Sequence, residues 1–192
     1  MNKLVLATKN KNKVIEINNL LKNTGIQIEE IKGDFNPVES GSTFEENAYI
    51  KGFEAAKLTN MPALADDSGL IVDSLNGMPG IYSARYAENT QKRIDKVLTE
   101  LKDVAPDKRT ARFVCSMVIV APSGETLYSC TGKCEGIILD EQKGEHGFGY
   151  DPIFLLPEFN KTMAELTLEQ KNNYSHRSKA LKCMIEWLKS SN

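Results

Sequence analysis

A nearly uninterrupted apolar run at residues 113–121 is the feature of this sequence that most constrains its fold. A strand that is exposed on one face alternates apolar and polar residues, and this run does not alternate. It therefore predicts a central strand that is covered on both faces. Helical and strand-like patterns both precede and follow the run, so we expect an α/β or α+β protein with a mixed sheet. One sequence does not determine the order of the strands.

The spacing of apolar residues predicts the other elements. One helix follows residue 10 and stops at Gly25, and a second begins at a capping box formed by Thr43 and Glu46 and runs towards Lys57. Further helices are expected over 91–101 and from residue 178 onwards. Short strands are expected at 3–7, 26–31, 63–65, 70–72, 127–130, 136–139 and 153–155, with 127–130 and 136–139 as antiparallel neighbours. We treat residues 1–192 as a single domain.

Composition excludes several classes of protein. The chain has 24 Lys and Arg against 26 Asp and Glu, and this balance argues against a protein that coats nucleic acid. No apolar run approaches the roughly 20 residues that span a bilayer. The apolar stretch near the N-terminus is too short for a secretory signal. We therefore expect a cytoplasmic protein that binds neither nucleic acid nor membrane.

The four cysteines are too few and too scattered for a disulfide scaffold. Cys115 lies in the apolar run and Cys183 in a helical pattern, so both are expected to be small core residues. Cys130 and Cys134 are separated by three residues without a nearby histidine, which does not favour a zinc site. This cysteine usage is typical of a reducing compartment.

The segment from Thr8 to Lys13 lies between the first strand and the first helix. A hydroxyl from Thr8, an amide from Asn10, the Lys13 ammonium and the amides of a helix N-terminus together can bind phosphate. The glycines of a P-loop are missing. The alternative is an ordinary capped helix start with surface lysines.

Two adjacent aspartates, Asp66 and Asp67, follow an apolar strand and precede Ser68-Gly69. Neighbouring residues of a strand point to opposite faces, so the two carboxylates are expected to have different roles. A carboxylate at a strand end is a usual ligand for Mg²⁺. The alternative is an Asx-turn that closes a hairpin.

Two later segments carry further candidates. In Gly147–Pro152, glycines allow close approach to a ligand, Phe148 and Tyr150 can stack on a base, and the Asp151 carboxylate can accept a hydrogen bond from a ring N–H. The alternative is a glycine turn with both aromatic rings in the core. Lys171, His176 and Arg177 form a basic cluster before the last helix, and such a cluster can equally be a solvated face.

Together these segments supply phosphate donors, an acid for a metal, a base-stacking loop and a basic clamp. This combination predicts a site for a nucleoside polyphosphate with Mg²⁺.

The chain also resembles the inosine triphosphate pyrophosphatases, the family that hydrolyses non-standard purine nucleoside triphosphates. The matching motifs occur in order over nearly the whole chain. They are Leu6-Ala7-Thr8-x-Asn10-x-x-Lys13, Thr43-Phe44-x-x-Asn47-Ala48, Ala65-Asp66-Asp67-Ser68-Gly69-Leu70, Pro79-Gly80-Ile81-Tyr82-Ser83-Ala84-Arg85-Tyr86, Gly147-Phe148-Gly149-Tyr150-Asp151-Pro152-Ile153-Phe154, Ala164-Glu165-Leu166 and Ser175-His176-Arg177. One departure is Lys9, where many members have glycine.

The resemblance implies an elongated mixed α/β structure with two lobes that flank a nucleotide-binding cleft. It also implies a homodimer and Mg²⁺-dependent hydrolysis of ITP, dITP or XTP to the monophosphate and pyrophosphate. By position, Asp67 matches the catalytic acid and a metal contact, and Glu39 matches the second metal-site acid. The substrate-binding positions implied by the resemblance are Thr8, Lys9, Asn10, Lys11, Asn12, Lys13 and Ser68 for the triphosphate and Phe148, Gly149, Tyr150, Asp151, Lys171, His176 and Arg177 for the nucleoside.

Two rival functions differ in substrate or in class. A related pyrophosphatase for pyrimidine or modified nucleotides would share the phosphate and metal residues but give no meaning to the Phe148–Asp151 and Ser175–Arg177 segments. A nucleotide sensor without turnover would not need to keep Lys13 and the Asp66-Asp67-Ser68 sequence. Whether Asp66 contacts the metal or supports the backbone stays open at this stage.

Overall fold

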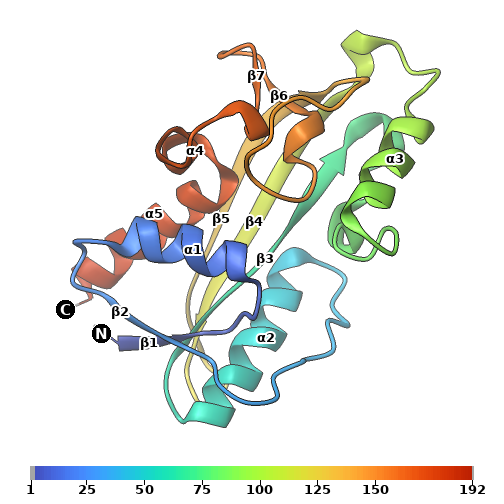
Figure 1. The fold of residues 1–192 in the computed structure, drawn as a ribbon. Coiled ribbons are helices and arrows are strands. Elements are labelled where there is room, and N and C mark those ends of the chain that lie inside the picture. The colour runs from blue at the N-terminus through green and yellow to red at the C-terminus, as the bar shows by residue number, and fades with distance from the viewer. Residues whose placement is uncertain (1–2, 192) are drawn as a thin grey trace. The chain divides into compact units, whose positions relative to one another are not determined.

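The computed structural model describes residues 3–191 as a mixed α/β fold (Figure 1). Over this range the helices are α1 (Lys11–Leu21), α2 (Phe44–Thr59), α3 (Thr90–Glu100), α4 (Leu168–Tyr174) and α5 (His176–Ser190). The strands are β1 (Lys3–Leu6), β2 (Gln27–Glu30), β3 (Ala63–Val72), β4 (Thr110–Val120), β5 (Thr126–Ile138), β6 (Phe154–Leu156) and β7 (Lys161–Thr162).

The strands form one seven-stranded sheet in the order β2-β1-β3-β4-β5-β6-β7. Strand β1 pairs in parallel with β2 and β3, whereas β6 is antiparallel to β5 and β7. The sheet is therefore mixed, as predicted, and β4 lies at its centre. Among residues 3–191, no helix is both long enough and apolar enough to cross a bilayer.

The chain divides into two compact units that alternate along the sequence. Unit 1 comprises the described residues up to Asp67, then Cys115–Gly132, then those from His176 onwards; unit 2 comprises Ser68–Val114 and Lys133–Ser175. Strands β3, β4 and β5 each contribute residues to both units. Neither unit is a continuous stretch of chain, so no single cut in the sequence separates them.

In unit 1, helices cover both faces of the sheet. Leu4 and Leu6 of β1 pack in one core cluster with α1 and α5, whereas Val5 and its neighbours pack in another with α2 (Figure 1). Strand β4 alternates in the same way, because successive side chains of a strand point to opposite faces. The apolar run at 113–121 is explained by this coverage, and the prediction of a strand buried on both faces is confirmed.

Unit 2 has one core of its own. It combines Leu70 and Val72 of β3 with Ile94 and Val97 of α3 and with apolar residues of β4, β5 and β6. The rings of Phe113 and Phe154 lie 4.4 Å apart between centroids. This core includes Ile138 and Tyr150, which flank the loop over residues 139–149.

Two predicted breaks in the strands are wrong. Asp66 and Asp67 lie within the continuous strand β3, not at the end of a strand or in a turn. Residues 127–130 and 136–138 lie on the single strand β5, which ends before residue 139, so the two predicted strands are not antiparallel neighbours. A Cβ added to Gly132 would collide with the backbone of α5 at His176 and Ala180. This glycine therefore allows helix and strand to approach closely, and it does not mark a turn.

The cysteines also differ from expectation. Cys115 and Cys134 are buried thiols, but Cys183 of α5 is bonded to Cys130 of β5 in a disulfide and is not an isolated core residue. The bond joins residues 53 positions apart in the sequence. Beside it, the ring of Tyr128 stacks on Trp187, with 4.8 Å between centroids. Strand β5 and helix α5 are thus held together by a covalent bond as well as by packing.

Candidate active site

The two adjacent aspartates of β3 face different partners, as the alternation of a strand requires. Asp66 is 2% exposed, and its Oδ2 lies 2.9 Å from Lys13 Nζ and 3.4 Å from Arg177 Nε. The Arg177 guanidinium also donates to Glu16 Oε2 at 2.5 Å. The Cys115 thiol donates weakly to Asp66 Oδ2, at 3.7 Å. Asp66 is therefore the centre of a buried ionic network that joins α1, β3, β4 and α5.

The electrostatics of Asp66 favour a permanent charge. Burial alone would raise the pKa of this carboxyl, but the charges of Lys13 and Arg177 outweigh it and hold the pKa well below its usual range. Burial opposes the charge of Arg177, but the neighbouring carboxylates of Asp66 and Glu16 outweigh it and raise the pKa of Arg177. The network is a buried structural anchor in which each charge faces an opposite charge. Oδ1 of Asp66 itself has no hydrogen-bond partner among the described residues.

Asp67 has a different environment. Its Oδ1 lies 3.1 Å from Lys51 Nζ, and the same ammonium lies 2.6 Å from Glu39 Oε1. Among the described residues, Oδ2 of Asp67 has no hydrogen-bond partner although it is buried. Burial raises the pKa of Asp67, and the nearby charge of Glu39 adds to this, against the opposing effect of Lys51. A carboxylate with one unpaired oxygen and a raised pKa can bind a ligand or accept a proton.

The oxygen donors around Lys51 fit a magnesium ion. Glu39 and Asp67 offer the hard carboxylate oxygens that Mg²⁺ prefers, and the unpaired Oδ2 of Asp67 leaves one of them available. Within residues 3–191 there is no cluster of three or more side chains of the kinds that ligate metals. Two carboxylates, completed by water and substrate phosphates, are the usual protein contribution to such a site.

The start of α1 is a capped helix, which was the alternative to a phosphate cradle. Asn10 Oδ1 accepts from the amides of Asn12 at 3.0 Å and Lys13 at 3.4 Å, while the Asn10 amide donates to Thr8 Oγ1 at 3.2 Å. Lys9, Asn10, Lys11 and Asn12 are exposed, whereas Lys13 is drawn into the Asp66 network. The cap and a role in phosphate binding are compatible, because helix N-termini attract anions.

A second group of candidate residues lies in unit 2. Asp151 Oδ2 accepts from Lys171 Nζ at 2.7 Å and from the Phe148 amide at 2.9 Å. Lys171 Nζ also lies 4.9 Å from the centre of the Phe148 ring. Asp151 and Lys171 are 3% and 5% exposed. The loop is therefore held in one shape by a buried ion pair, with the half-buried Phe148 ring beside the ammonium.

The other predicted residues of these segments have separate environments. Tyr150 is buried in the core of unit 2, and its hydroxyl donates to Ser83 O at 2.9 Å. Gly149 and Ser68 are half-buried. His176 is 6% exposed and begins α5 in unit 1. The solvated-face alternative for Lys171, His176 and Arg177 is wrong, because all three are buried.

Sequence reasoning missed two residues of these networks, Lys51 and Glu16. Lys51 is 9% exposed and binds both Glu39 and Asp67. Its only signal is a position one helical turn after Asn47 of the matching motif. Glu16 lies between two isoleucines on α1, where a charged residue beside the apolar face could have indicated a buried partner.

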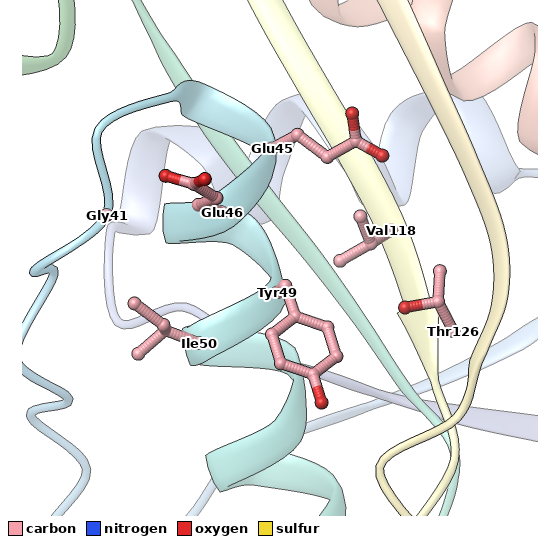
Figure 2. A pocket seen from close by; sticks show the side chains of 7 residues that line it. All are labelled: Gly41, Glu45, Glu46, Tyr49, Ile50, Val118 and Thr126. Atoms are coloured by element: carbon pink, nitrogen blue, oxygen red, sulfur yellow. The ribbon is translucent and has the colours of Figure 1, made fainter.

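A hollow of about 380 Å³ also lies in unit 1. Its lining residues come from the start of α2 and from the sheet: Gly41, Glu45, Glu46, Tyr49, Ile50, Val118 and Thr126. Figure 2 shows Glu45 and Tyr49 on the side of α2 that faces the strands carrying Val118 and Thr126. None of the site residues expected from the sequence lines it.

Comparison with known proteins identifies the family. Residues 4–187 match the model of the Ham1 family. A dITP/XTP pyrophosphatase of Halalkalibacterium halodurans is 50% identical over 98% of this chain and 100% of that protein. One of Desulforamulus reducens is 50% identical over 97% of this chain and 95% of that protein. The structure of the Staphylococcus aureus Ham1 protein matches with a TM-score of 0.88 and 41% identity, over 99% of this chain and 100% of that one. The chain therefore belongs to the Ham1 family.

Proposed function

We propose that this protein is a nucleoside triphosphate pyrophosphatase that hydrolyses dITP, ITP and XTP to the monophosphate and pyrophosphate with Mg²⁺. The observation that carries the proposal is Asp67, a buried carboxylate between Lys51 and Glu39 with an unpaired Oδ2 and a raised pKa. The names of the full-length relatives support the substrate class.

In the proposed reaction, water attacks the α-phosphorus in line with the departing pyrophosphate. The Asp67 carboxylate orients this water and accepts its proton. Lys13 and the positive end of the α1 dipole attract the phosphates of the leaving group, and Lys51 adds a positive charge beside Asp67. Mg²⁺ held by Glu39 and Asp67 would offset phosphate charge and lower the pKa of a bound water.

The purine would be selected by hydrogen bonds to its 6-keto oxygen. Inosine and xanthosine carry an acceptor there, where adenosine carries an amino donor. The buried Lys171 ammonium, held by Asp151 beside Phe148, is a donor that would meet no acceptor in ATP. Sites built on such hydrogen bonds discriminate by roughly 10⁴-fold. Rejection of GTP, which is also 6-keto, would have to act at the 2-position.

Pyrophosphate release from dITP, XTP, GTP, ATP and dTTP, with and without Mg²⁺, tests the proposal. We expect release from dITP and XTP only with Mg²⁺, and a nucleoside monophosphate as the second product. Release of orthophosphate would identify a phosphatase instead. Preference for dTTP would favour the pyrimidine alternative, and tight nucleotide binding without turnover would favour the sensor.

We also propose that the protein acts as a homodimer in the cytoplasm and binds no nucleic acid. The dimer is supported by the family resemblance, and the charge balance of −2 argues against a polyanion-coating surface. Light scattering of the purified protein measures the oligomeric state. A mass of one chain would contradict the dimer.

A further inference from the structure

Asn47 is a fully buried polar residue that the proposed chemistry does not use. It lies on α2, one turn before Lys51 and on the same side of the helix, and it is 0% exposed. Its Oδ1 accepts from the Gly41 amide at 2.8 Å. Within residues 3–191, its Nδ2 has no hydrogen-bond partner. A half-satisfied buried amide lowers stability relative to a leucine of similar size, so its packing alone does not account for it.

Residues 41–43, which precede α2, pack closely against the first turn of that helix. Glu46 Oε2 accepts from the Ser42 amide at 2.7 Å, and from the Thr43 amide at 3.2 Å. A Cβ added to Gly41 would lie 2.6 Å from Glu46 Cβ and 2.9 Å from Asn47 Oδ1. Figure 2 shows Glu46 on the side of α2 towards the Gly41 segment. The contact therefore requires glycine at position 41 and an acceptor at position 47.

This contact determines where Glu39 lies. Glu39 is two residues before Gly41, and its carboxylate lies 2.6 Å from Lys51 Nζ. Helix α2 thus holds the segment in two ways, through the backbone at Gly41 and through the side chain of Glu39. Residues 31–41 have no regular secondary structure, and their inner end is held by Ile31 and Phe35 in the core. If the backbone contact at Gly41 is lost, fewer contacts order the stretch between Phe35 and Ser42 that carries Glu39.

We propose that Asn47 is a positioning residue, which seats the Gly41 segment on α2 so that Glu39 is preorganised beside Asp67 for a divalent cation. The inference rests on the proposed function, in which Glu39 and Asp67 hold that cation. Asn47 touches neither the cation nor the nucleotide and acts only through Gly41. Loss of the hydrogen bond between Asn47 and Gly41 weakens cation binding and leaves kcat at a saturating cation concentration nearly unchanged.

Two variants of Asn47 and one matched control separate this role from simple stability. Asn47→Leu keeps the volume but removes the acceptor, whereas Asn47→Asp keeps it, and a negative charge near a helix N-terminus is favourable. Thr59→Ala is the control, because it removes a side-chain hydrogen bond of 2.8 Å to Ala55 O at the far end of the same helix. Gly41→Ala displaces the segment from α2 without changing Asn47. It replaces Asn47→Leu in the same measurements if that variant does not fold.

Hydrogen exchange followed by mass spectrometry measures protection of residues 39–43. Electron paramagnetic resonance measures the Kd of Mn²⁺ in the presence of a dITP analogue with nitrogen in place of the α–β bridging oxygen. In Asn47→Leu we expect lost protection, an approximately tenfold higher Kd for Mn²⁺ and a similar rise in the half-saturating Mg²⁺ concentration. The kcat at saturating Mg²⁺ should stay within about threefold. Asn47→Asp should retain protection of residues 39–43, and Thr59→Ala should stay within about twofold of wild type in each measurement.

Unchanged Mn²⁺ affinity in an Asn47→Leu protein that has lost protection of residues 39–43 would overturn the inference. Wild-type protection of residues 39–43 in Asn47→Leu would overturn it as well, because the position of the Gly41 segment on α2 would then not depend on Asn47. The proposed function fails separately, if the wild-type protein releases no pyrophosphate. In that case exchange and Mn²⁺ binding still decide whether Asn47 positions Glu39.

Discussion

Asp66 and Asp67 are neighbours on one strand, yet the two sides of β3 use their carboxylates in opposite ways. On the Asp66 side, Lys13, Arg177 and Glu16 complete a buried network, and the pKa of Asp66 is lowered. On the Asp67 side, Lys51 shares its charge between two carboxylates, one oxygen of Asp67 lacks a partner within the described residues, and its pKa is raised. Each carboxylate keeps one oxygen without a partner among the described residues. What separates the anchor from the reactive group is the charge around the other oxygen: two cations face Asp66, whereas Asp67 shares one cation with Glu39.

The largest expected effect is on stability, at Asp66. Asp66→Asn leaves Lys13 and part of Arg177 buried without a compensating charge, so the free energy of unfolding should fall by about 3–5 kcal/mol. Asp67→Asn should change it by less than about 1 kcal/mol, because Lys51 keeps the Glu39 carboxylate as its partner. Urea denaturation of both variants measures the difference, and equal losses would remove the distinction between the two sides.

Breaking the Cys130–Cys183 bond tests the same anchor from a distance, because α5 carries Arg177. The bond closes a long loop, so the double variant Cys130→Ser/Cys183→Ser should lose about 2–4 kcal/mol of stability. Its melting temperature should fall by about 5–10 °C. Calorimetry measures the shift, with Cys134→Ser as a control that keeps the disulfide. An unchanged melting temperature would show that packing alone holds α5 on β5.

At Asp67 the main effect should be on turnover. Asp67→Asn preserves shape but removes the proton acceptor, so kcat with dITP should fall by about 10²-fold or more at saturating Mg²⁺. Steady-state pyrophosphate release gives kcat, and the urea midpoint confirms that the variant is folded. Near-wild-type turnover in Asp67→Asn would contradict the assignment of Asp67 as the general base.

The pH dependence of stability should have opposite signs at the two residues. The lowered pKa of Asp66 means that its contribution is present above the unfolded value of about 3.9 and is lost as pH falls towards its folded pKa. The raised pKa of Asp67 means that its contribution is present below that value and is lost as pH rises through its folded pKa.

These opposite pH dependences can be measured as the free energy of unfolding of each variant minus that of wild type, between pH 3 and 7. The loss in Asp66→Asn should grow as pH rises to about 5, whereas Asp67→Asn should gain relative to wild type as pH rises from about 4. These differences are on the order of 1.4 kcal/mol for each unit of pKa shift. Parallel profiles for the two variants would contradict the opposite shifts.

The elements that could be predicted are those with strong local signals. The capping box at Thr43 forms as predicted, and the capped helix start given as the alternative for residues 8–13 is found at Asn10. In both, the capping residue and its backbone partners are three or fewer residues apart. The helix at 90–100 follows its own apolar spacing. The breaks predicted at Asp66 and between residues 130 and 136 are wrong, because polar residues within these strands interrupt the apolar pattern and their distant partners cannot be known from the sequence.

The candidate site was predicted in part for the same reason. Motif residues such as Asp67 and Asp151 could be named from the sequence, but Lys51 and Glu16 could not, since their partners are 12 or more positions away. In the sequence, Lys171, His176 and Arg177 form one basic cluster. The structure pairs Lys171 with Asp151, and Arg177 with Asp66 and Glu16.

The sequence by itself determined the central buried strand, the helix starts, the family and the two aspartates that differ in role, because each depends on a local pattern or on the alternation of a strand. Only the tertiary structure decided which aspartate is the anchor. Adjacent carboxylates are chemically identical, and what separates them is the charge that distant segments place beside each: Lys13, Arg177 and Glu16 around one, Lys51 and Glu39 around the other. Burial then turns that difference into pKa shifts of opposite sign.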